Sequence, residues 1–68
     1  MTDKQTAIVD RLGETNIPIM NSVALAIANT EIWDNDFFKA YRDGMVQAIC
    51  LLGMITEEER DILRGEKA

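Results

Sequence analysis

The fold is decided by residues 34–53, which read DNDFFKAYRDGMVQAICLLG. Asp34 predicts a helix N-cap, because its carboxylate can accept a hydrogen bond from the backbone of the first turn. Asp36 adds negative charge beside the positive end of the helix dipole. Gly53 interrupts the pattern, so we expect a helix that runs to about Leu52 and is the longest in the chain.

The start of this helix has one alternative. Trp33 and Phe38 flank the Asp34 cap with the spacing of a hydrophobic staple, which favours the start given above. Thr30 followed by Glu31 is the competing start, and it would begin the helix one turn earlier. The pattern leaves the boundary open between these positions.

The two halves of the expected helix differ in polarity. In the first half, four polar side chains share one face: Asp36, Lys39, Asp43 and Gln47. From residue 45 to residue 55 nearly every side chain is apolar, and a helix that is apolar all round has to be covered all round. In a monomer two short helices and a tail would have to cover it, whereas a second copy of the chain would do so more easily.

A first short helix is expected over residues 3–12. Thr2 and Gln5 have the spacing of a capping box, in which each residue bonds the backbone of the other. Gly13 is suited to the left-handed position just after a helix, so it predicts the end of this one.

A second helix is expected from Pro18 to about Thr30. Proline fits the first turn of a helix, where its missing N–H costs nothing. Residues 19–28 also alternate as a strand would, but their helical spacing and their alanines favour a helix. A strand here would find no partner strand in the chain.

The last helix is expected over residues 57–64. Thr56 predicts its N-cap, Glu59 completes a capping box, and Gly65 ends it. The whole pattern predicts an all-α fold, a compact bundle of three to four short helices with a C-terminal αα-hairpin, completed by dimerisation. Residues 1–68 are expected to form one domain, since a single core needs about this much chain.

The composition argues against an enzyme. The chain has no histidine, so neither Ser22 nor Cys50 has an imidazole to activate it. A calcium loop opening at Asp34 would need glycine and glutamate where Lys39 and Met45 stand. We therefore expect no catalytic residue, no metal site and no cofactor.

Charge and hydropathy argue against nucleic acid and a membrane as partners. The chain carries 12 acidic and 7 basic residues, a net charge of −5. Arg60, Arg64 and Lys67 could align on one helix face, but neighbouring acids cancel their field, so nucleic acid is not the expected partner. No apolar segment is long enough to span a bilayer and residues 1–10 lack an apolar signal region, so we expect a cytoplasmic protein without a membrane partner.

All four aromatic residues fall between residues 33 and 41. They are Trp33, Phe37, Phe38 and Tyr41. Phe37 and Phe38 point about 100° apart on a helix, so one core cannot bury both equally. Two interpretations follow: a wide aromatic core contact beneath a solvated acidic face, or an aromatic patch with an acidic rim that docks a protein with a basic surface or a second subunit.

A stripe along the same helix favours self-association. Its members step by four and three residues: Phe37, Tyr41, Gly44, Ala48, Leu51 and Ile55. A parallel stripe of Phe38, Met45 and Leu52 can serve the core, so that one stripe packs within the monomer and the other against a partner. The spacing leaves open which stripe takes which role. The predicted interface comprises Glu31, Trp33, Asp34, Asp36, Phe37, Tyr41, Gly44 and Ala48.

These observations predict a small acidic helical protein without enzymatic activity. We expect a homodimer that binds and modulates another protein, as an accessory regulator or inhibitor. The alternatives are a structural or assembly component of a larger particle and a small dimeric DNA-binding regulator built on the C-terminal hairpin. Small size, capped helices and the lack of catalytic groups resemble the accessory proteins of phages and mobile elements, a likeness that no motif carries.

Overall fold

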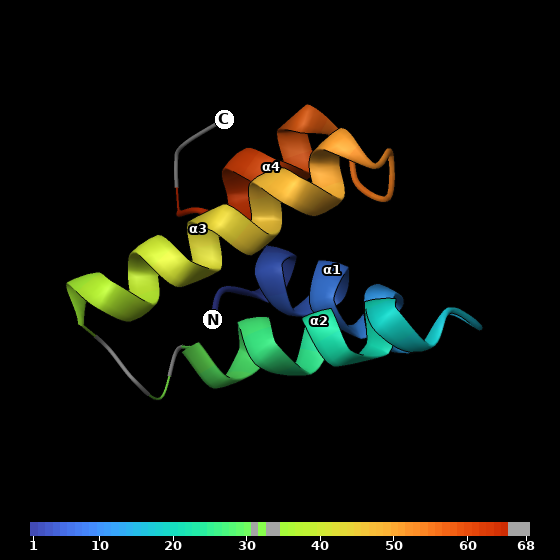
Figure 1. Ribbon diagram of the computed structural model, residues 1–68, viewed down its shortest axis with the longest axis horizontal. Coiled ribbons are helices and arrows are strands. Elements are labelled where there is room, and N and C mark those ends of the chain that lie inside the picture. The colour runs from blue at the N-terminus through green and yellow to red at the C-terminus, as the bar shows by residue number, and fades with distance from the viewer. Residues whose placement is uncertain (31, 33–34, 66–68) are drawn as a thin grey trace.

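Four helices make up the described part of the chain: α1 (Asp3–Gly13), α2 (Pro18–Thr30), α3 (Asp36–Leu51) and α4 (Glu57–Leu63). The structure is a computed structural model that describes residues 1–30, 32 and 35–65. Figure 1 shows α1 and α2 side by side, with α3 packed against α2 and α4. The expected all-helical fold is confirmed, and α3 is the longest of these helices.

Both predicted capping boxes are confirmed. The Thr2 hydroxyl accepts from the Gln5 backbone N–H at 3.2 Å, and the Gln5 side chain accepts from the Thr2 N–H at 2.9 Å. Thr56 and Glu59 exchange the same two bonds at the start of α4, at 3.1 and 2.9 Å. Pro18 is the first residue of α2, as its fixed backbone angle predicts.

Helix α3 starts one residue later than the sequence predicts. Its N-cap is Asn35, whose side-chain oxygen accepts from the Phe38 N–H at 3.0 Å, so the assignment of the cap to Asp34 is wrong. Asparagine and aspartate cap equally well, and a cap at Asn35 leaves Asp36 beside the positive end of the dipole. The staple positions each move one residue along, so Trp33 and Phe38 no longer have that spacing. Asp34 and Trp33 themselves lie outside the described residues.

Gly53 ends α3 in the left-handed conformation, with φ of 79°. The Met54 N–H bonds the Ile49 carbonyl at 3.0 Å, and the Gly53 N–H bonds the Cys50 carbonyl at 3.0 Å. This pair of bonds is the Schellman motif, which satisfies the last carbonyls of a helix. Gly65 adopts the same conformation after α4, so both predicted stops are confirmed.

The C-terminus of α1 is capped from another helix. Gly13 is the last residue of α1 and Glu14 follows with φ of −95°, so the prediction of a left-handed Gly13 is wrong. Asn21 of α2 directs its Nδ2 amide to the carbonyl oxygens of Leu12, Gly13 and Thr15, at 3.2, 3.0 and 3.1 Å. These bonds satisfy the end of the helix and hold α1 against α2.

The core collects side chains from all four helices and from the segment between α3 and α4. Its buried members are Ile8, Val9, Leu12, Met20, Ala24, Ile27, Val46, Ile49, Ile55 and Leu63. The radius of gyration is 10.8 Å, against about 11 Å for a compact chain of this length. The monomer is therefore already compact, although α3 contributes only Val46 and Ile49 to its buried core.

Polar side chains tie the C-terminus of α4 to the rest of the bundle. Gln5 of α1 donates from Nε2 to the Ile62 carbonyl at 2.9 Å. Arg42 of α3 donates from Nη2 to the Arg64 carbonyl at 3.1 Å. Helix α4 has only seven residues and is too short to be stable alone, so these bonds help to hold it in place.

Replacing Asn21 by alanine tests the cap on α1. Asn21→Ala should lower the free energy of unfolding by about 1–3 kcal/mol, because partly buried carbonyls lose their donor. Urea denaturation followed by circular dichroism measures this loss. Asn16→Ala, at an exposed position before α2, is the matched control and should cost little; equal losses in the two variants would contradict the role of Asn21.

A second prediction concerns the stability of the protein at low pH, where Glu59 becomes protonated. Arg11 Nη1 lies 2.6 Å from Glu59 Oε2, and the pKa of Glu59 is lowered first by the hydrogen bond from Arg11, burial opposing it, and further by bonds from Thr56. Because the pKa of Glu59 is lower in the folded protein than in the unfolded chain, where it is about 4.3, its ionised form stabilises the fold above that pH. This contribution is lost as the pH falls through the folded pKa of Glu59. Glu59→Gln keeps the capping box but removes the ion pair.

Thermal melts should therefore place Glu59→Gln below the unmodified protein at pH 7, and the gap should shrink at pH 3. The loss at pH 7 should be at most about 1 kcal/mol, because the Arg11 side chain is more than half exposed. Glu58→Gln, exposed on the same turn, is the control. A gap that stays constant with pH would contradict the ion pair as its cause.

Candidate protein-binding face of α3

The predicted interface residues that the structure describes are all exposed. They are Asp36, Phe37, Tyr41, Gly44 and Ala48, and all belong to α3. Glu31, Trp33 and Asp34 lie outside the described residues. The described part of the predicted interface is thus gathered on one helix.

All of these residues except Asp36 lie on the side of α3 that faces away from the core, and Asp36 points about 100° away from Phe37. Side chains turn by about 100° per residue, so Phe37, Tyr41, Gly44, Ala48 and Leu51 all point within about 40° of one direction. Val46, which is fully buried in the core, points in the opposite direction. We call Phe37, Tyr41, Gly44, Ala48 and Leu51 the outer face of α3.

Large apolar side chains on this face are open to solvent. Phe37 is 70% exposed, Tyr41 52% and Leu51 78%, and the adjoining Leu52 is 67% exposed. Single exposed apolar residues are common on proteins, whereas large exposed apolar patches are typical of interaction surfaces. An ideal Cβ at Gly44 meets no atom within 4 Å, so the centre of the face is open as well.

The aromatic core interpretation is wrong for Phe37 and Tyr41. Phe38 is half-buried, whereas its neighbour Phe37 points to solvent. The two rings meet edge to face, with centroids 5.0 Å apart and planes at 89°. Adjacent positions on a helix point about 100° apart, which explains why one ring packs inward and the other does not.

The structure corrects both expected stripes at the end of α3. Ile55 is buried in the core and is not part of the exposed stripe, because the chain reverses at Gly53. Leu52 belongs to the second stripe with Phe38 and Met45, yet it is exposed while they are half-buried, so this stripe does not pack inward along its whole length. The predicted interface also omitted Leu51, although its spacing in the stripe identified it.

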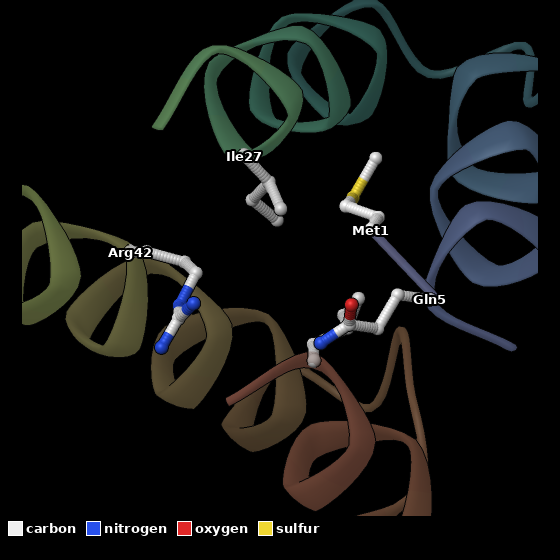
Figure 2. A pocket seen from close by; sticks show the side chains of 5 residues that line it. Met1, Gln5, Ile27 and Arg42 are labelled. Atoms are coloured by element: carbon white, nitrogen blue, oxygen red, sulfur yellow. The ribbon is translucent and has the colours of Figure 1, made fainter. Parts of the chain in front are cut away.

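One space between the helices, in the part of the chain that the structure describes, is too small for an organic ligand. Figure 2 shows Met1, Gln5, Ile27 and Arg42 around a cavity of about 60 Å³, with Leu63 completing its lining. Pockets that bind small organic ligands measure about 300–1,000 Å³. This cavity has room only for about two waters.

Other site chemistry is limited in the part of the chain that the structure describes. Within residues 1–30, 32 and 35–65, no three histidine, cysteine, aspartate or glutamate side chains gather where they could hold a metal. Cys50 is half-buried on α3. Arg42 pairs with Asp43, and Arg60 with Asp61, each at 3.0 Å.

None of the described helices combines the length and the hydropathy that crossing a bilayer requires.

The outer face of α3 can form hydrophobic contacts with another protein surface. Aromatic side chains at its N-terminal half and Leu51 with the adjoining Leu52 at its C-terminal half supply area. Gly44 and Ala48 allow a close approach. Comparison of the chain with protein-family models, curated proteins and solved structures found no match.

Proposed function

We propose that this protein works by binding other proteins and not by catalysis. In this proposal the outer face of α3 pairs with the same face of a second copy, and the dimer binds and modulates a partner with a basic surface. The observation that supports it most is the row of exposed Phe37, Tyr41 and Leu51 opposite the core. The C-terminal αα-hairpin of α3 and α4 would present this row.

The exposed area fits a small dimer interface. Taking about 200 Å² for a fully exposed large side chain, Phe37, Tyr41, Leu51 and Leu52 together present roughly 500 Å² at their measured exposures. Two copies would bury roughly 1,000 Å², near the lower limit for a specific interface. Contacts from smaller neighbouring residues would add to this.

The order of side chains favours an antiparallel pair. With the two-fold axis midway between Gly44 and Ala48, each Gly44 meets Ala48 of the second copy, and each Tyr41 meets its Leu51. Small residues at the centre bring the helices together, and large residues on both sides fill the space that remains. Antiparallel helix dipoles also attract each other.

The proposed modulation of a basic partner rests on charge. The chain has a net charge of −5, and an acidic surface speeds and orients encounters with a basic one. Binding of this kind would block the nucleic-acid-binding surface of such a partner. A role as an inhibitor or accessory regulator follows.

Gly44→Gln tests the pairing. The new side chain meets no atom within 4 Å of its Cβ, and leaving glycine should raise helix stability by about 0.5–1 kcal/mol. The same side chain would keep two α3 helices apart. Light scattering on a sizing column should give a dimer mass for the unmodified protein and a monomer mass for Gly44→Gln.

Gly13→Gln is the matched control, since a Cβ at Gly13 is equally free of contacts but lies at the end of α1. It should remain dimeric. A monomeric unmodified protein at high micromolar concentration, or a dimeric Gly44→Gln, would contradict pairing through this face.

Truncating the aromatic residues gives an independent test. The double variant Phe37→Ala, Tyr41→Ala should weaken association by about tenfold or more. It should affect monomer stability less, because Phe37 is 70% and Tyr41 52% exposed. Sedimentation equilibrium measures association, and urea titration measures folding. Unfolding of the double variant would instead show that the two rings are needed for the monomer.

A further inference from the structure

A shallow groove lies between α1 and α2, lined by residues of these helices and by the adjoining Glu14. Its volume is about 400 Å³. Val9 and Ala24 are buried at its base, Ala28 is half-buried, and Leu25 stands beside it with 64% of its surface exposed. Small alanines along α2 leave room for a large apolar side chain from outside.

One rim of the groove is acidic. Asp10 and Glu14 lie four residues apart along α1 and its C-terminal end, so their carboxylates are neighbours. The opposite wall, α2, has the sequence PIMNSVALAIANT and carries no charged residue. The groove therefore offers an apolar base and wall along one negative edge.

The end of α1 adds to this negative potential. Asn21 lines the groove and bonds the carbonyl oxygens of Leu12 and Gly13. These carbonyls form the C-terminal end of α1, where the helix dipole is negative and favours cations. A positive group next to Glu14 would meet both the carboxylate and the dipole.

We propose that this groove binds an amphipathic helix of a partner protein, with leucine-like side chains on one face and lysine or arginine along the edge. The apolar side chains would occupy the space above Val9, Ala24 and Ala28, and the cations would lie against Asp10 and Glu14. An amphipathic helix laid in a groove is a common mode of peptide recognition. The carboxylates would repel the phosphates of nucleic acid or of an anionic bilayer.

This inference rests on the proposed function, because it identifies where a partner with a basic surface would dock. It does not depend on pairing through α3, since the groove and the outer face of α3 are built from different helices. The two proposals therefore fail separately.

The test uses a synthetic helical peptide of about 14 residues, or four turns, with leucines on one face and lysines beside them. Fluorescence anisotropy should show micromolar binding, and an isotope-edited NMR titration should shift Val9, Ala24, Leu25 and Ala28. A peptide with glutamate in place of lysine, and one of the same composition with leucines on every face, should each bind about tenfold more weakly or worse.

Two pairs of variants distinguish the groove from the rest of the surface. Gly13→Gln extends a side chain at the groove without a clash and should weaken peptide binding about tenfold, whereas Gly44→Gln should bind as the unmodified protein does. Glu14→Lys should weaken binding more than Glu57→Lys, which is on α4. The groove proposal would be overturned if the peptide with leucines on every face bound as tightly as the amphipathic one. It would also be overturned if Glu14→Lys and Glu57→Lys weakened binding equally, or if the NMR shifts were confined to α3.

If Gly44→Gln stayed dimeric while the peptide results held, pairing through α3 would fail and the groove would stand. If Gly44→Gln became monomeric and no peptide bound, the groove would fail and the pairing would stand.

Discussion

Helix α3 buries one side against α2 and α4, and the described part of the chain leaves its opposite side to solvent. The remaining helices are short and are occupied elsewhere: α1 packs on α2, and α4 is held by Gln5 and Arg42. A chain of 68 residues has a high ratio of surface to volume and buries a smaller fraction of its surface than a larger domain does. The exposed outer face of α3 agrees with this ratio.

Polar side chains satisfy backbone groups at the starts and ends of the helices. The capping boxes at Thr2 and Thr56 satisfy helix starts locally, while Asn21, Gln5 and Arg42 satisfy helix ends across the bundle. Each of the latter three does two things at once, because it supplies a hydrogen bond and fixes one helix on another. These bonds act together with a core of ten buried apolar residues among those that the structure describes.

Local patterns predicted most of the fold. Capping boxes, the proline at the start of α2 and the glycines at 53 and 65 act through neighbouring atoms, so the sequence alone reveals them. Gly13 was misjudged because its helix end is satisfied by Asn21, eight residues away on another helix. The stripe on α3 was visible as spacing, but which side faced the core depended on how α2 and α4 pack. The groove between α1 and α2 required the packed structure altogether.

In the proposed homodimer the outer face of α3 contacts the same face of a second copy. Isotope-filtered NMR on an equal mixture of labelled and unlabelled protein measures this contact directly, since it records only contacts between copies. Antiparallel pairing predicts cross-peaks between the Tyr41 ring of one copy and the Leu51 methyl groups of the other. A spectrum that places contacts between copies elsewhere, or that shows none at millimolar concentration, would contradict the claim.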